Sequence, residues 1–183
     1  HRAAALRDAG HPLRMAVNVS MSQLLVPGFE IMVAEALADG GLPAELLEIE
    51  ITESVAMQSP DIVLPRLAAL KQLGVCVAID DFGTGYSSLS SLEKLAPERL
   101  KIDRSFVMGL DADTGGGSLA EMIIELGRAL GLKVIAEGVE TPTQRQRLIE
   151  LGCDELQGYL FSPPLPIESL GEWLAKHGEG FAL

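Results

Sequence analysis

The sequence predicts an α/β fold in which parallel strands alternate with helices. Short runs rich in Val and Ile alternate with amphipathic segments along the chain, and the runs are apolar enough to be buried between layers. The 183 residues are 48% hydrophobic, which suffices for a sizeable core. A closed (β/α)8 barrel needs about 250 residues. Six units in 183 residues therefore favour a barrel with about six of its eight units, and an open doubly wound sheet is the alternative.

The predicted elements follow from hydrophobic periodicity. The strands are Arg14–Ser20, Leu46–Thr52, Val75–Asp80, Arg99–Asp103, Lys133–Glu137 and Glu155–Tyr159. The helices are Ser22–Asp39, Asp61–Leu73, Ser87–Leu95, Ser118–Leu130, Pro142–Leu151 and Ile167–His177.

Local signals mark where these helices begin and end. Thr141 and Gln144 have the spacing of a capping box around Pro142, a favoured first helical residue. Ser20 and Gln23 have the same spacing. Glycines mark the expected helix ends, at Gly40, Gly74, Gly131 and Gly152. The glycine run within 111–118 predicts a flexible loop.

Composition excludes several classes of protein. The net charge of −12 argues against a surface for duplex nucleic acid, and an anionic substrate would need metal ions to approach. Cys76 and Cys153 lie in apolar or small-residue surroundings, which indicates reduced thiols and a cytoplasmic protein. No apolar run reaches the roughly 18 residues of a membrane span. A chain that begins at His1 suggests a piece of a longer polypeptide.

Polar residues end every predicted strand, where the chemistry of parallel α/β folds collects. They are Asn18, Glu50, Asp80 with Asp81, Lys101 with Asp103, Glu137 and Gln157. Taken singly, each residue is more simply a helix cap or a solvated turn. Taken together, the oxygen donors without His or Cys suit Mg²⁺ or Mn²⁺. Asp80 and Asp81 need a cation, because adjacent carboxylates repel.

Alternation along the strands predicts a second charged cluster at the strand starts. Glu48 shares the parity of Glu50, while Ile49 faces the helices. Because an unpaired buried charge is costly, we expect Glu48 to pair with Arg14 or Lys133. The alternative is a frayed start with all three side chains in solvent.

Six segments carry a resemblance to a known family. They are Asn18-Val19-Ser20, Glu50-Ile51-Thr52-Glu53, Asp80-Asp81-Phe82-Gly83-Thr84-Gly85-Tyr86-Ser87-Ser88, Lys101-Ile102-Asp103, Ala136-Glu137-Gly138-Val139-Glu140-Thr141 and Gln157-Gly158-Tyr159. Their order and spacing resemble EAL domains over nearly the whole chain. The resemblance implies a modified TIM-type (β/α)8 barrel that hydrolyses cyclic di-GMP to linear pGpG with two Mg²⁺ or Mn²⁺ ions. It also implies bacterial signalling and, in the full-length protein, a fused GGDEF or sensory domain and a possible membrane tether.

The resemblance also implies roles for individual residues. The implied metal ligands are Asn18, Glu50, Asp80, Asp81 and Glu137. Lys101 is expected to hold the attacking water, with Asp103, Glu137 and Glu140 as catalytic partners and Gln157 on the substrate. Glu53 is expected to anchor the loop 81–88.

The chain departs from the family pattern in one respect. The Glu-Ala-Leu signature, whose Glu is a metal ligand in the family, does not precede Asn18, and Glu35-Ala36-Leu37 lies downstream in a helical stretch. We therefore expect residues 1–183 to be an EAL-type domain without its N-terminal βα units and with impaired hydrolysis. Exposed strand edges would favour a homodimer. The alternatives are a non-catalytic cyclic di-GMP-binding effector and a dimerisation module.

Overall fold

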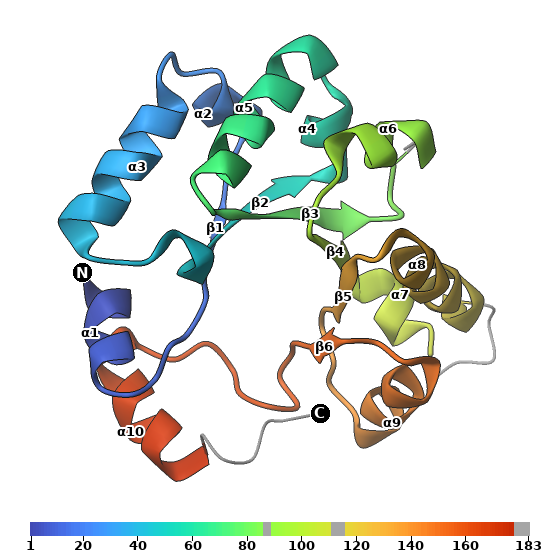
Figure 1. Cartoon of the computed structure of the whole chain (residues 1–183). Helices are drawn as coiled ribbons and strands as arrows, with labels where there is room; N and C mark the ends of the chain where they lie inside the picture. Colours follow the sequence, from blue (N-terminus) through green and yellow to red (C-terminus); the bar gives the residue numbers. More distant parts are fainter. Residues whose placement is uncertain (86–88, 111–115, 178–183) are drawn as a thin grey trace. The chain divides into compact units, whose positions relative to one another are not determined.

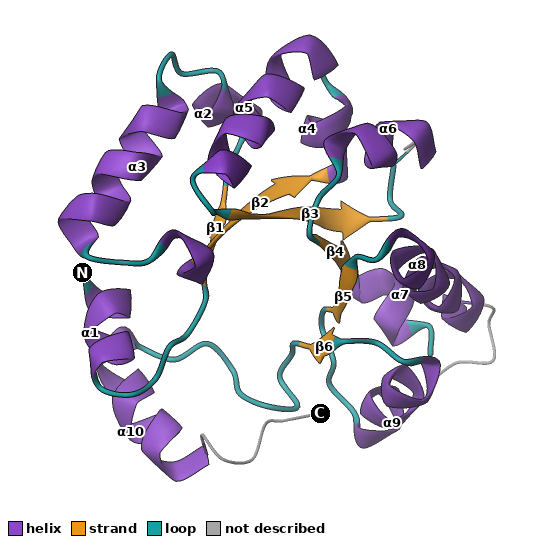
Figure 2. Ribbon diagram, in the orientation of Figure 1, coloured by secondary structure: helices purple, strands orange, loops and turns teal. Residues whose placement is uncertain are grey.

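A computed structural model describes residues 1–85, 89–110 and 116–177, without the side chains of 116–118. The chain divides into two compact units, His1–Lys101 and Ile102–Leu183, and each is described separately below. Figures 1 and 2 show their helices and strands.

Parallel strands form the framework of the first unit. They are β1 (Met15–Asn18), β2 (Leu47–Thr52), β3 (Cys76–Phe82) and β4 (Arg99–Ile102), whose last residue begins the second unit. The register pairs Asn18 with Glu50 and Thr52 with Asp80. The carboxyl ends of these strands therefore bring the predicted polar residues to one edge of the sheet.

Helices connect the strands of the first unit. They are α1 (Arg2–Asp8), α2 (Met21–Leu24), α3 (Phe29–Gly40), the 3₁₀ turn η1 (Ala44–Leu46), α4 (Glu53–Met57), α5 (Pro60–Gln72) and α6 (Leu89–Leu95). The single helix predicted over Ser22–Asp39 is wrong. Pro27 and Gly28 divide it, and Gly28 adopts a left-handed φ of 75° as the N-cap of α3. The predicted start of α6 at Ser87 lies outside the described residues.

The core of the first unit lies between the strands and the helices. Helices α4 and α5 pack against β3, and α4 also packs against β2 (Figure 1). Ile49, Ile51, Val77 and Ile79 are almost completely buried. Ile49 and Ile51 alternate with Glu48 and Glu50, and Ile79 precedes Asp80, so the opposite face of β2 and β3 carries these charged side chains.

The second unit repeats the strand–helix alternation. Its elements are α7 (Arg104–Met108), α8 (Gly116–Leu130), β5 (Lys133–Ala136), α9 (Pro142–Leu151), β6 (Glu155–Leu156) and α10 (Ile167–His177). Strands β5 and β6 are parallel. The capping box of Thr141 and Gln144 is confirmed. The predicted loop over 111–118 is wrong at Gly116 and Gly117, which belong to α8, and residues 111–115 lie outside the described part.

Within the first unit the strands are neighbours in the order of the chain, β1 to β4, and in the second unit β5 lies beside β6. A doubly wound sheet reverses its strand order at a switch point, so this alternative is wrong and the barrel-type α/β class is confirmed. Short helices α1, α4 and α7 were not predicted, because five to seven residues give little periodicity. Among the described helices, none combines the length and the hydropathy that crossing a bilayer requires.

Candidate functional site

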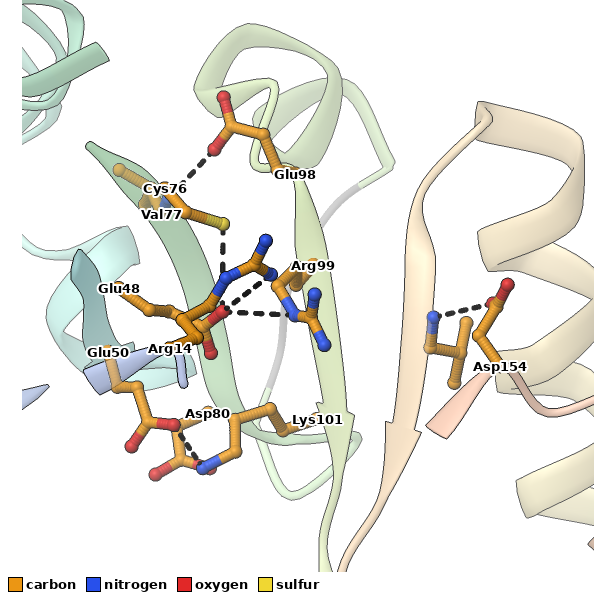
Figure 3. A network of polar contacts seen from close by, with 11 residues as sticks. Arg14, Glu48, Glu50, Cys76, Val77, Asp80, Glu98, Arg99, Lys101 and Asp154 are labelled. Atoms are coloured by element: carbon orange, nitrogen blue, oxygen red, sulfur yellow. Dashed lines mark hydrogen bonds and ion pairs between the residues drawn. The ribbon is translucent and has the colours of Figure 1, made fainter. Parts of the chain in front are cut away.

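One face of the strands in the first unit carries buried charges. As whole residues, Glu48, Glu50, Arg99 and Lys101 are each at most 5% exposed, and they alternate with the apolar core residues. Figure 3 shows the two glutamates and the two cations facing one another across the strands. Buried charges persist only when they are paired. The alternation of residues along the strands therefore predicted the charged face correctly. The ion pairs on that face determine its chemistry.

Lys101 lies between two carboxylates at the carboxyl ends of the strands. Its Nζ is 2.6 Å from Oε1 of Glu50 and 3.4 Å from Oδ1 of Asp80 (Figure 3). The Lys101 and Glu50 side chains are 5% and 6% exposed. Water screens such a site little, so two carboxylates here require a shared positive charge. The ammonium group supplies that charge.

Two further predicted residues lie beside this group. Asn18 is exposed at the end of β1 and pairs with Glu50 in the strand register. Asp81 adopts a left-handed φ of 53°, and its N–H donates to Oδ1 of Asp80 at 3.0 Å. A positive φ is uncommon outside glycine and is often found at functional sites. The structure thus brings Asn18, Glu50, Asp80, Asp81 and Lys101 to one edge of the first unit.

Glu53 contacts the segment that follows the aspartate pair. Its carboxylate Oε2 accepts the N–H groups of Gly83 at 2.9 Å and Gly85 at 3.1 Å, and its side chain is buried at the start of α4. A Cβ on Gly85 would lie 2.8 Å from Oε1 of Glu53. Glycine at position 85 therefore permits the close approach. The remainder of the predicted loop, 86–88, lies outside the described residues.

A second buried network surrounds Glu48 at the start of β2. Oε2 of Glu48 lies 3.5 Å from Nη1 of Arg14 and 3.0 Å from Nε of Arg99, and the thiol of Cys76 donates to it at 3.6 Å. The predicted pairing with Arg14 is confirmed. Lys133 pairs instead with Asp154 at 2.6 Å. The pairing of Arg99 with Glu48 was not predicted, although Arg99 lies two residues before Lys101 in β4 and its side chain therefore lies on the same face.

Burial, together with the negative charge of Glu48, raises the pKa of the Cys76 thiol to about 11. Burial also raises the pKa of the Cys153 thiol, in the second unit, to about 11. Both cysteines are free thiols. Because the thiolate is the reactive form, neither cysteine is a nucleophile near neutral pH.

The second unit holds the other four predicted site residues. Oδ1 of Asp103 accepts the N–H of Ser105 at 2.9 Å and caps α7. The N–H of Glu137 donates to the carbonyl of Ile102 at 3.2 Å, which places Glu137 beside the end of β4. Gln157 follows β6, and its carbonyl accepts the N–H of Val139 at 3.0 Å. These residues gather at the strand ends of their own unit.

Glu140, between β5 and α9, forms an ion pair. Nη2 of Arg104 donates to its Oε1 at 2.6 Å. The N–H of Glu140 donates to Oε1 of the buried Gln144 at 2.8 Å. Arg104 was missed at the sequence level, because nothing local connects a residue at the start of α7 with one 36 positions later.

The residues of the first unit fit a divalent metal by their chemistry. Glu50 presents a buried carboxylate and Asp80 a partly buried one around one positive charge, and Asn18, opposite Glu50 in the strand register, has an amide oxygen to offer. Oxygen donors of this kind suit Mg²⁺ and Mn²⁺. Within the described residues, no three His, Cys, Asp or Glu side chains lie together as a ready-made metal cage. In this arrangement the ammonium group of Lys101 compensates the negative charge of Glu50 and Asp80.

Comparisons with known proteins place the chain in a family. A family model described as "EAL domain" matches residues 1–164. The chain is 47% identical over 174 residues to the cyclic di-GMP phosphodiesterase NbdA of Pseudomonas aeruginosa. This match covers 94% of the chain and 22% of NbdA. The chain thus spans about a fifth of that relative.

Solved structures agree with the family match. PaMucR phosphodiesterase, solved as a c-di-GMP complex, aligns with a TM-score of 0.89 and 43% identity over 92% of this chain and 69% of its own. Klebsiella pneumoniae BlrP1, solved as a manganese/cy-diGMP complex, aligns with a TM-score of 0.80 and 32% identity over 89% of this chain and 41% of its own. The chain belongs to the EAL domain family.

Proposed function

We propose that this domain binds cyclic di-GMP and hydrolyses it to linear pGpG with two divalent metal ions, Mg²⁺ or Mn²⁺. The observation that carries the proposal is the buried group in which Lys101 Nζ lies 2.6 Å from Glu50 and 3.4 Å from Asp80. Such a group provides both metal-binding oxygens and a cation for a phosphate reaction. The names of NbdA and PaMucR support the choice of substrate.

The metal ligands would be Asn18, Glu50, Asp80 and Asp81. For Glu137, the same role is proposed only because the sequence resembles the family's motif at that position. Bound divalent ions neutralise carboxylates, bind a phosphodiester and lower the pKa of a coordinated water. Substrate approach also favours this arrangement, because a chain of net charge −12 repels a dianion unless cations intervene.

The chain's own residues would divide the remaining work. Lys101 orients the water and stabilises the charge that develops on phosphorus oxygens, because its ammonium is held in a dry site. Water adds its oxygen to phosphorus, the bond from phosphorus to the 3′ oxygen breaks, and the leaving oxygen takes a proton. Asp103, Glu137 and Glu140 are the proposed groups for holding and moving that proton, and Gln157 would contact the substrate. Glu53 would hold Gly83 and Gly85 beside the aspartate pair.

The test measures pGpG by chromatography after the chain is incubated with cyclic di-GMP. We expect product with Mn²⁺, none with EDTA, and a loss of about 100-fold or more for Glu50→Gln. Calorimetry in Ca²⁺ separates binding from cleavage. Binding without any product would support the effector alternative. Absence of both binding and product would overturn the proposal and favour a dimerisation module.

A further inference from the structure

Arg104 and Glu140 of the second unit form an ion pair in unusually constrained surroundings. Arg104 opens α7, and Glu140 immediately precedes Thr141, the N-cap of α9. The two side chains are 55% and 39% exposed, so their pairing contributes little to stability. The neighbouring residues nevertheless fix both partners.

The aliphatic stem of Arg104 packs against the backbone of Gly138. This glycine has a left-handed φ of 69°, and a Cβ placed on it would lie 2.3 Å from Cγ and 2.8 Å from Cβ of Arg104. No side chain fits between Arg104 and the backbone at position 138. The aliphatic part of the arginine therefore lies directly on the backbone next to Glu137, at the carboxyl end of β5.

Glu140 is held at its backbone as well as at its carboxylate. Oε1 of Gln144 accepts the N–H of Glu140 at 2.8 Å and that of Thr141 at 3.1 Å. The Gln144 side chain is 4% exposed, so this acceptor is part of the packed interior. With the backbone fixed, the ion pair with Arg104 determines where the carboxylate points.

The guanidinium group has a single role in the part of the chain that is described. Its hydrogen bond goes to Glu140, whereas the adjacent Asp103 turns to Ser105 and caps α7. A charge-assisted bond of 2.6 Å fixes the direction of a carboxylate. The Arg104–Glu140 bond therefore contributes little to the free energy of unfolding, but it sets the direction of the Glu140 carboxylate.

We propose that Arg104 is a positioning residue, which orients the Glu140 carboxylate for the hydrolysis of the phosphodiester. This inference rests on the proposed function and on the role proposed there for Glu140. Small displacements of a group in the reaction cost up to about 100-fold in rate. Arg104 therefore acts on kcat through Glu140, without itself binding the nucleotide.

The experiment is a double-mutant cycle on pGpG formation in Mn²⁺ with Arg104→Gln, Glu140→Gln and the double variant. We expect each single variant to lower kcat by roughly 10- to 100-fold with little change in KM, and the double variant to be no slower than the slower single one. Arg104→Lys should restore part of the rate, because it keeps the charge. Arg147→Gln, which changes an exposed arginine of α9, should have the wild-type rate.

The outcomes separate this inference from the proposed function. An active wild-type chain with a normal Arg104→Gln rate, or losses that multiply in the double variant, would overturn the positioning role alone. A rise in KM in place of a fall in kcat would show that Arg104 binds the nucleotide and would equally overturn it. A wild-type chain that forms no pGpG would overturn the proposed function itself. Melting curves of all variants should match the wild type, since the pair is exposed.

Discussion

The carboxylate of Glu48 on β2 lies 3.0 Å from Nε of Arg99 on β4, and both side chains are buried. Removing one partner of a buried pair leaves a desolvated charge without compensation. Glu48→Gln should therefore lower the free energy of unfolding by about 3–5 kcal/mol in urea titrations.

Arg14→Gln is the matched control for that variant. Arg14 contacts the same oxygen at 3.5 Å, but its side chain is 41% exposed. Its removal should cost at most about 1 kcal/mol. Equal costs for Glu48→Gln and Arg14→Gln would show that burial does not govern this network.

Lys101→Met removes the charge that Glu50 and Asp80 share. Because the carboxylates then lie unpaired in a buried site, we expect a loss of about 3–5 kcal/mol in metal-free urea titrations. Mn²⁺ should restore part of that loss by supplying positive charge to the same oxygens. Lys133→Met tests the reasoning, since Lys133 lies the same 2.6 Å from Asp154 but is 64% exposed. It should cost no more than about 1 kcal/mol.

Asp80→Asn should affect metal binding more than folding. The amide keeps an oxygen for the N–H of Asp81, so the local backbone is preserved. The loss of charge should weaken Mn²⁺ binding at least about tenfold by calorimetry and abolish most pGpG formation. Asp61→Asn changes an exposed carboxylate in the first turn of α5 and should alter neither. Normal turnover by Asp80→Asn would exclude Asp80 as a ligand.

Two helix glycines should respond to alanine in opposite directions. In α8, a Cβ on Gly127 would lie 2.2 Å from Cγ2 of Val134, so Gly127→Ala should destabilise the chain by about 1–3 kcal/mol. In α10, no atom lies within 4 Å of a Cβ on Gly171. Gly171→Ala should stabilise by about 0.5–1 kcal/mol, because alanine loses less entropy in a helix. Thermal unfolding of both variants measures the difference, and the same sign for both would contradict the packing described.

The Cys153 thiol predicts a stability change at high pH. Its pKa is raised from 9.0 to about 11, because burial disfavours the thiolate. A group with a raised pKa in the folded state stabilises fully below the unfolded pKa, and this contribution disappears as the pH rises through the folded value. Wild-type stability should therefore fall towards that of Cys153→Ala between about pH 9 and 11. A constant difference between the two across that range would show that the thiol is not titrating as described.

Local signals in the sequence determined much of this fold. The caps at Ser20 and Thr141 were predicted correctly, because a capping box involves residues only three positions apart. Strand alternation likewise assigned Glu48 and Glu50 to one buried face, since the side of a strand on which a residue lies depends on its own backbone. The pairing of Glu48 with Arg14 followed from the cost of burying a charge.

Only the tertiary structure decided which charges meet. Arg99 beside Glu48, and Arg104 beside Glu140, are contacts between segments far apart in the chain, and no periodicity encodes them. The position of Lys101 between Glu50 and Asp80 has the same origin, because strand register sets which residues lie opposite each other. The sequence by itself therefore determined the strands and most of the longer helices, the faces of the strands and the kinds of donor at the strand ends. The distances that make those donors a site came from packing the strands side by side, which is a non-local property of the whole chain.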